Sequence, residues 1–405
     1  MLDDFGQRIR DIILSEMDLS RELSDEEICD LIGSVVSREA RDRPMTIKDR
    51  AELERTIFNS LRKLDVLQEL VDDRDVTEIM VNGPNDIFYE KAGRIQRFKG
   101  HFSSEEKLED VIQQIVGRHN RVVNQASPIV DTRLSDGSRV NIVLNPISIG
   151  GSAVSIRKFP EHPMSMERLV EIEALSPEVA RLLQILTQAK YNIFISGGTG
   201  SGKTTFLNAL SQYIPDDERI ITIEDSAELQ LLGAKNIVRL ETRNANTDGV
   251  TPITIRDLIR TALRMRPDRI IVGECRGAEA LDMLQAMNTG HDGSLSTGHA
   301  NSPHDIISRI ETMVLQGQDF PLNAIRQQIA SGIDIIVQLG RLRDKSRRVL
   351  EVSEVDGLVD GEIVLHTLYR FEETAVLDSG RIQGFLKKAG TLCHTDKLMA
   401  AGLSV

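Results

Sequence analysis

The stretch "NIFISGGTGSGKTTFLNAL", residues 192–210, decides how this chain is interpreted. An apolar, strand-like run enters a turn rich in glycine, and a helix-like pattern follows it. Gly197, Gly202, Lys203 and Thr204 satisfy the pattern G-x-x-x-x-G-K-[ST], which is the P-loop. Glycines let backbone N–H groups curl around a phosphate, and the helix points its positive dipole end at the anion. The residues expected to contact ATP are Gly197, Gly198, Thr199, Gly200, Ser201, Gly202, Lys203, Thr204 and Thr205.

The same motif assigns individual roles. We expect Lys203 to reach the β- and γ-phosphates and Thr204 to hold Mg²⁺ through its hydroxyl. The alternative, a structural glycine turn with an incidental lysine, is disfavoured by the strand before the motif and the helix after it. The fingerprint G-x-G-x-x-G is not present in this stretch, which argues against a nicotinamide cofactor.

The composition excludes several classes of function. Of the 405 residues, 40% are hydrophobic and 27% are charged, as in a folded globular protein. A net charge of −13 and only 4% aromatic residues argue against nucleic-acid binding. The three cysteines, Cys29, Cys275 and Cys393, are far apart, which indicates a reduced protein without disulfides or a zinc site. The charged N-terminus and the absence of an apolar run of about 18 residues predict that any membrane role is peripheral.

The pattern of the chain changes several times, and it predicts five segments. Residues 1–65 are expected to be helical, and one helix among them begins with a capping box in which Ser24 precedes Glu27 by three positions. Residues 66–158 show short strands, a hairpin at Asp136-Gly137 and a helix capped by Ser103 or Ser104, which indicates an α+β domain. A proline-containing linker is expected over 159–170 and an α/β domain with a mostly parallel sheet over 171–372, followed by a tail, 373–405, that carries only a weak pattern.

Two strand ends after the P-loop carry acids. "RIIVGE" ends in Glu274, which stands where a Walker B aspartate is common, and "RIITIEDSAEL" carries Glu224, Asp225 and Glu228. Parallel strands place their carboxyl ends at one edge, so these acids could supply a metal ligand and a water-positioning base. Two alternatives stay open: Glu274 as a plain surface acid, and Asp225 or Ser226 as a cap of a following helix.

Histidines and arginines complete the candidate site. In "TGHDGSLSTGHAN", His291 follows Gly290 and fits a helix end, whereas His299 is as readily structural as functional. Arg256, Arg260 and Arg264 recur every four residues on a helix expected around 254–266. Because no acid recurs on this stripe, the arginines indicate an acidic partner, a phosphate or a neighbouring subunit, unless they form a solvated face. Further arginines flank this region: Arg243, Arg266, Arg269 and Arg276.

Three arginines of the preceding domain fall on strand-turn segments just before the linker. They are Arg133, Arg139 and Arg157. Such residues could lean over the nucleotide as arginine fingers, which stabilise the charge on a transferring phosphoryl group. We therefore include them, with Arg243 and Arg264, among the candidate nucleotide-binding residues.

These motifs together carry a family resemblance. The sequence resembles the type II/IV secretion ATPase superfamily, and specifically the CpaF-type ATPases of Tad (Flp) pilus assembly, over roughly residues 60 to 340. The matching stretches are "GGTGSGKTT", "TIEDSAELQL", "VRLETRNAN", "LSDGSRVNI" and "RDLIRTALRMRPDRIIVGECRGAEALDMLQAMNTGHDGSLSTGHANSP". The tetracysteine zinc segment of type II secretion relatives is not present. Gly298 departs from the pattern, which favours a bulkier residue before His299.

The resemblance implies a homohexameric ring at the cytoplasmic face of the bacterial inner membrane, working with membrane platform proteins. The acidic composition separately predicts that no nucleic acid is bound. It implies a RecA-like domain that hydrolyses ATP with Mg²⁺ and drives domain motion. Glu274 would be the Walker B carboxylate and a metal ligand with Thr204, Glu224 would belong to the acidic box and His299 to the histidine box. Arg139 and Arg157 match the arginines that contact the γ-phosphate.

Other functions remain to be weighed against this motor. They are a conjugation or type IV secretion ATPase of the same superfamily, a P-loop phosphotransferase acting on a small acceptor, and a scaffold ring that binds nucleotide without turnover. DNA translocation is disfavoured by the acidic composition. The intact Lys203 and Glu274 favour hydrolysis over a scaffold.

Overall fold

The computed structural model describes residues 4–17, 20–21, 23–43, 45–91, 93–118, 122–159, 163–231, 233–243 and 251–405. The chain divides into two compact units, Met1–Glu161 and His162–Val405. Residues 160–162 of the expected linker and 244–246 of "VRLETRNAN" lie outside the described residues. Within the described residues, no helix is both long and apolar enough to cross a membrane.

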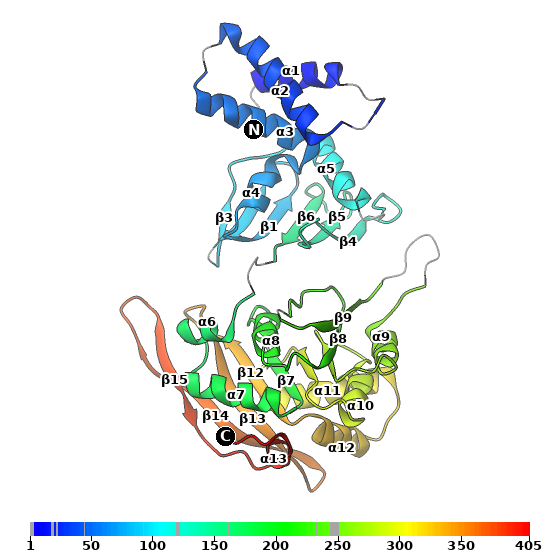
Figure 1. The fold of residues 1–405 in the computed structure, drawn as a ribbon, viewed down its shortest axis with the longest axis vertical. Helices are drawn as coiled ribbons and strands as arrows, with labels where there is room; N and C mark the ends of the chain where they lie inside the picture. Colours follow the sequence, from blue (N-terminus) through cyan, green and yellow to red (C-terminus); the bar gives the residue numbers. More distant parts are fainter. Residues whose placement is uncertain are drawn as a thin grey trace. The chain divides into compact units, whose positions relative to one another are not determined.

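The first unit contains a helical part and a six-stranded sheet (Figure 1). Its helices are α1 (Asp4–Glu16), α2 (Asp25–Glu39), α3 (Ile47–Arg62), α4 (Gln68–Asp72) and α5 (Glu105–Gly117), with 3-10 turns at Ala40–Asp42 and Asp65–Leu67. Its strands are β1 (Val76–Asn82), β2 (Ile87–Lys91), β3 (Arg94–Arg97), β4 (Ile129–Arg133), β5 (Arg139–Val143) and β6 (Ala153–Arg157). The strand order is β3-β2-β1-β6-β5-β4, and every pair is antiparallel.

Local sequence signals explain where these elements begin. The Ser24 side chain accepts from the Glu27 amide at 3.2 Å while the Glu27 carboxylate accepts from the Ser24 amide at 2.9 Å, so the predicted capping box is confirmed. Ser104, one of the two predicted residues, caps α5. The β4–β5 hairpin closes around Gly137, whose φ of 89° suits glycine. The helical part and the sheet have separate apolar clusters.

The second unit is an α/β domain. Its helices are α6 (Met166–Glu171), α7 (Pro177–Gln188), α8 (Lys203–Ser211), α9 (Ile255–Ala262), α10 (Ala280–Asn288), α11 (Pro303–Gly317), α12 (Leu322–Gly332) and α13 (Asp396–Ala401). Its strands are β7 (Ile193–Gly197), β8 (Arg219–Glu224), β9 (Asn236–Glu241), β10 (Arg269–Val272), β11 (Leu295–Gly298), β12 (Ile335–Arg341), β13 (Arg347–Val359), β14 (Glu362–Val376) and β15 (Ile382–Lys388).

The nine strands form one sheet in the order β15-β14-β13-β12-β7-β11-β10-β8-β9. The six strands from β12 to β9 are parallel, and β13 to β15 extend the sheet antiparallel. The predicted mostly parallel α/β architecture is therefore confirmed. Residues 373–388, in the weakly patterned tail, complete β14 and form β15.

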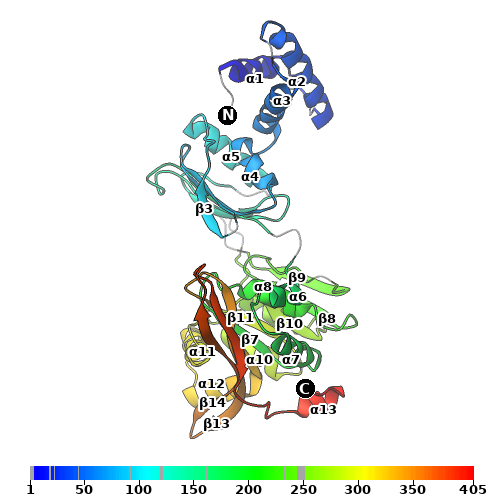
Figure 2. The same ribbon diagram turned by 90° about the vertical axis from the view of Figure 1, so that its left-hand side faces the viewer.

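Alternation along the strands separates two cores. Ile193 and Ile195 of β7 pack with α7 and α8, whereas Phe194 between them packs with α10, α11 and α12. Figure 2 shows α7 and α11 on opposite sides of the sheet. Helices thus cover both faces, which leaves the ends of the parallel strands as the place for a ligand.

Candidate nucleotide-binding site

Four neighbouring parallel strands end at one edge of the second unit. In sheet order they are β7, β11, β10 and β8, all of which are labelled in Figure 2. β7 leads into the P-loop, β11 is followed by His299, β10 by Gly273 and Glu274, and β8 ends in Glu224. The strand order therefore gathers residues that are up to about one hundred positions apart in the chain.

The phosphate loop has the backbone that its glycines were expected to allow. Gly200 and Gly202 have φ values of 71° and 95°, which L side chains rarely adopt. A Cβ at Gly197 would lie 2.6 Å from Ser201 Oγ and 2.7 Å from the Leu339 carbonyl oxygen, so no side chain fits there. Helix α8 begins at Lys203, and no side chain caps its first turn, so its amide groups are open to an anion.

Lys203 lies inside this loop and is only 7% exposed. Its ammonium donates to the carbonyl oxygens of Gly197 at 3.0 Å and Gly198 at 3.1 Å. A third contact joins its Nζ to His299 Nδ1 at 3.1 Å. Because an ammonium group only donates, Nδ1 of His299 must be the acceptor.

His299 links the lysine to Glu274. Its Nε2 lies 2.6 Å from Glu274 Oε1, and with Nδ1 as acceptor this nitrogen carries the ring proton. Burial, then the charge of Lys203, lowers the pKa of His299, so the neutral ring is favoured. Burial alone would raise the pKa of Glu274, but the Arg276 hydrogen bond at 2.6 Å and the neighbouring cations outweigh it and lower that pKa. Glu274 is thus an ionised member of a chain, not a plain surface acid.

Short hydrogen bonds fix this chain of side chains. Thr297 Oγ1 donates to the Gly273 carbonyl at 2.8 Å, and the Cys275 amide donates to the Thr297 carbonyl at 2.9 Å. These bonds tie the end of β11 to the end of β10. Gly298 pairs with Ser196 of β7 and is part of the ordered strand β11. A Cβ at Gly298 would lie 3.0 Å from Phe194 Cε1 and Ile306 Cδ1, so the expected bulkier residue would have to push these side chains aside.

Glu224 is buried beside the same edge. Its Oε2 accepts from the amides of Glu228 at 2.6 Å and Leu229 at 2.8 Å, and its buried Oε1 has no hydrogen-bond partner in the described part of the chain. Burial raises the pKa of Glu224 to about 7. A Cβ at Gly273 would lie 2.8 Å from Glu224 Cγ, so the glycine before Glu274 makes room for this side chain.

The segment after Glu224 settles one open alternative. Residues 225–231 form no helix, so Asp225 and Ser226 do not cap one. The Asp225 carboxylate lies 3.9 Å from Arg276. The acidic stretch therefore provides a buried carboxyl group and a second charge near Arg276.

Comparisons with known proteins place this site in a family. The family described as "Type II/IV secretion system protein" matches residues 60–382. The chain belongs to the type II/IV secretion system protein family.

Individual relatives agree with this family. The type IV secretion system protein PtlH of Bordetella pertussis is 33% identical over 321 residues, which span 73% of this chain and 95% of PtlH. The conjugal transfer protein TrbB of Rhizobium radiobacter is 32% identical over 316 residues, which span 77% of this chain and 93% of TrbB. The solved structure of the pilus retraction motor PilT with bound ADP has a TM-score of 0.54 at 23% identity, covers 76% of this chain and 82% of PilT, and supports the RecA-like fold.

The arginine stripe of this secretion-family chain has an internal partner. Arg256 Nε lies 2.9 Å and Arg260 Nε 3.0 Å from the two carboxylate oxygens of Asp282, which is 4% exposed on α10. The inferred need for an external acid is therefore wrong for these two residues. The expected helix also ends early, at Ala262, because Arg266 has a φ of 54° and Pro267 follows. The exposed Arg264 thus lies beyond the helix.

Three flanking arginines divide between core and surface. Arg269 is fully buried, where it pairs with Glu218 and donates to the Thr187 carbonyl at 2.7 Å. Arg276 binds Glu274 as described. Arg243 donates to the Thr251 carbonyl at 3.2 Å beside residues 244–250. The structure thus gives Arg269 a structural role and Arg276 a place at the site.

The arginines of the first unit form a row. Arg133 lies opposite Arg139 across β4 and β5, and Arg139 lies opposite Arg157 across β5 and β6. Directly opposed residues share one face of a sheet, so the three side chains start from the same face. The structure brings together the three residues that the sequence singled out.

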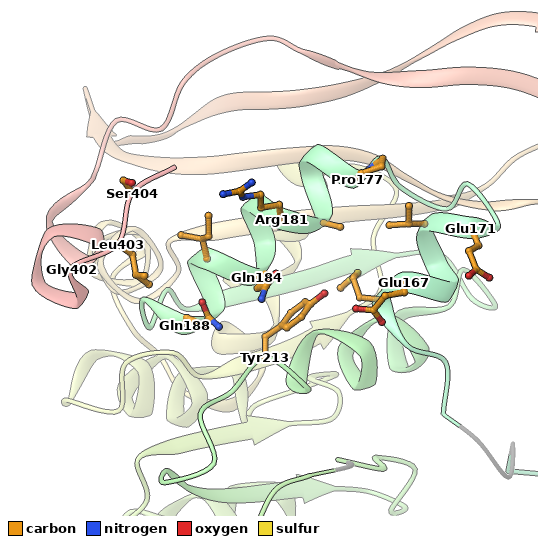
Figure 3. Close-up of a pocket in the computed structure, with 14 residues that line it drawn as sticks. Glu167, Glu171, Pro177, Arg181, Gln184, Gln188, Tyr213, Gly402, Leu403 and Ser404 are labelled. Atoms are coloured by element: carbon orange, nitrogen blue, oxygen red, sulfur yellow. The ribbon is translucent and has the colours of Figure 1, made fainter.

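Two further features were not found from the sequence. Arg347 of β13 donates through Nε to the Gly200 carbonyl at 2.9 Å, and only the basic run "RLRDKSRR" at 341–348 hinted at it. A surface pocket of about 830 Å³ lies between α6, α7, Tyr213 and residues 402–404 (Figure 3). It shares no lining residue with the P-loop, Glu224, Glu274 or His299, so it is separate from the candidate site.

Proposed function

We propose that the chain is an ATP-hydrolysing motor of a secretion or pilus machine. The observation that supports this most is the chain Lys203–His299–Glu274 at the carboxyl ends of three neighbouring strands. A bare glycine loop, an uncapped helix start and a buried lysine suit a triphosphate. The family relationship and the PilT-like fold agree with this function.

The two carboxylates suit different tasks because their environments differ. Glu274 has a lowered pKa and stays ionised beside cations, which suits a ligand of Mg²⁺ together with the Thr204 hydroxyl. The metal, when bound, would neutralise charge on the phosphates. Glu224 has a pKa of about 7, which suits a proton acceptor for the attacking water. The described residues hold no cluster of three acids, histidines or cysteines, so phosphate oxygens would complete the metal's shell.

The arginine row of the first unit would provide the other side of the site. We assign Arg133, Arg139 and Arg157 to the γ-phosphate, with Arg243 and Arg264 as further nucleotide contacts. Arginines at this position stabilise the transition state and distinguish ATP from ADP. Loss of the γ-phosphate would remove their contacts, and the domains would change their arrangement. A hexameric ring would couple such domain movements in its subunits into an ordered sequence.

The motor serves one particular machine in this proposal. We assign the motor to assembly, and possible reversal, of a Tad/Flp-type pilus at the cytoplasmic face of the inner membrane, with platform proteins as partners. The motif set that resembles CpaF-type ATPases supports this assignment. The second candidate is a conjugation or type IV secretion motor, which the named functions of PtlH and TrbB favour.

The test begins with the purified full chain. ATP turnover and mass in solution, each with and without nucleotide, should show slow hydrolysis and a ring of six chains. Lys203→Ala should abolish turnover, whereas Lys235→Ala, which removes an exposed lysine paired with Asp216, should not. If the wild type does not hydrolyse ATP, the chain is a scaffold ring that binds nucleotide without turnover. Phosphate transfer to a small acceptor would instead indicate a phosphotransferase. Deleting the gene then distinguishes the two candidate machines: loss of pili would indicate the pilus motor, and loss of DNA transfer would indicate the conjugation motor.

A further inference from the structure

The turn between β12 and β13 lies at the same edge as the P-loop. β12 pairs with β7, placing Leu339 beside Gly197, and Arg341 at the end of β12 pairs with Arg347 at the start of β13. Arg347 therefore projects from a strand that the sheet itself positions. Its Nε donates to the Gly200 carbonyl at 2.9 Å, and its Cδ would lie 3.5 Å from a Cβ built on Gly202.

Hydrogen bonds within the turn and one to Ile382 of β15 hold this turn in place. The Leu342 amide donates to the Ser346 carbonyl at 2.8 Å. Asp344 Oδ1 accepts from the Ser346 amide at 2.9 Å and its hydroxyl at 2.6 Å, while Oδ2 accepts from the Ile382 amide at 2.8 Å. The base of the Arg347 side chain is thus fixed before any ligand arrives.

The contact with Gly200 has a consequence for the next amide. A peptide bond is planar and trans, so its C=O and N–H point in opposite directions. The Gly200 carbonyl accepts from Arg347, and the Ser201 amide therefore points the opposite way, into the loop, where it donates a long hydrogen bond of 3.3 Å to the Gly198 carbonyl. An anion held in the loop would compete with that carbonyl for the inward N–H.

Arg347 differs from the neighbouring arginines in the partner of its guanidinium group. Arg343 pairs with Glu373 and Arg348 with Glu173. Arg347 has no carboxylate within 4.0 Å in the part of the chain that the structure describes. Its positive charge therefore remains beside the loop that receives the phosphates.

We propose that Arg347 is a positioning residue for the nucleotide, which holds the Gly200–Ser201 peptide with its N–H turned inward and adds a cation beside the phosphates. This inference rests on the proposed function, because it assigns Arg347 to the same nucleotide site. It predicts that Arg347 strengthens binding of the phosphates common to ADP and ATP.

The test compares three variants of the full chain with the wild type. Arg347→Ala should raise the Kd for ADP about tenfold, as expected for losing one hydrogen bond from a charged donor at an exposed site. Arg341→Ala is the matched control, because it removes the same charge from the same turn, whereas its Nε donates to the Lys345 carbonyl and not to the P-loop. Arg347→Lys keeps one donor and should bind ADP within about threefold of the wild type.

Further measurements separate this role from a loss of structure. Arg347→Ala should raise KM for ATP while kcat stays within about twofold, because the contact acts on bound phosphates before and during reaction. Its unfolding midpoint should equal that of the wild type, since the side chain is exposed. Unchanged ADP affinity in Arg347→Ala, or an equal loss of affinity in Arg341→Ala, overturns the role of Arg347 and leaves the proposed function unaffected. Failure of the wild type to bind nucleotide overturns the proposed function as well.

Discussion

Glu224 lends itself to a test of stability against pH. Its carboxyl group ionises with a pKa near 4.5 when unfolded and about 7 when folded, because burial disfavours the charge. Between these values the folded chain binds one more proton than the unfolded chain, so stability falls as pH rises through this window. The difference corresponds to about 3 kcal/mol when fully developed, at about 1.4 kcal/mol for each pH unit.

Glu224→Gln removes the ionisation and keeps an oxygen that can accept from the Glu228 and Leu229 amides. The variant should therefore gain about 2–3 kcal/mol relative to the wild type between about pH 5 and pH 8.5. At about pH 5 it should be equally stable or slightly weaker, because the new amide group puts a donor where the buried Oε1 stands.

Urea titrations without nucleotide would measure this difference. Labelling of Cys275 is a suitable probe, because Cys275 is buried in the second unit while Cys29 and Cys393 are exposed and react at once. Glu228→Gln is the control, since it removes a less buried acid four residues away and keeps the carboxyl group of Glu224, so the fall in stability with rising pH should persist. A pH-independent effect of Glu224→Gln would show that water reaches this carboxyl group, and the assignment of Glu224 as a proton acceptor would be lost.

Four more predictions follow from the same geometry. Glu218→Ala leaves the buried charge of Arg269 unpaired and should cost about 3–5 kcal/mol in urea unfolding; a loss below 1 kcal/mol contradicts the pairing. His299→Ala should lower ATP turnover on the order of 10²-fold with ADP binding retained, and wild-type turnover should fall in acid, at a pH below the ordinary histidine range, as the ring protonates. Arg139→Ala should keep the Kd for ADP but lower turnover on the order of 10³-fold; equal loss of both would remove the γ-phosphate role. Gly298→Ala should lower stability by about 1–3 kcal/mol in thermal unfolding, unless the strand shifts freely.

Local signals predicted local structure well. The caps at Ser24 and Ser104 and the hairpin at Gly137 depend on neighbours within a few residues, so their sequence patterns suffice. The helix after Thr254 was predicted too long, because a left-handed residue before Pro267 ends the pattern early.

Contacts between distant segments could not be obtained in this way. Asp282 lies more than twenty positions after the arginines that it binds, and nothing in their spacing indicates it. Arg347 reaches the P-loop only because three antiparallel strands extend the sheet beyond β12, and the sequence assigned no strand there. The family resemblance identified His299 and Glu274 as site residues. It did not predict their contact, which depends on the order of the strands.

Strand order also suggests how a phosphate could be sensed at the carboxylates. Lys203 has three N–H donors, and their partners are the carbonyls of Gly197 and Gly198 and the ring of His299. A phosphate oxygen that takes one of these donors must displace a partner. If the partner is His299, its ring loses the contact that fixes Nδ1 as acceptor and is free to turn away from Glu274. Because β11 lies between β7 and β10, this single side chain connects the loop that holds the phosphates to the carboxylate that would hold the metal.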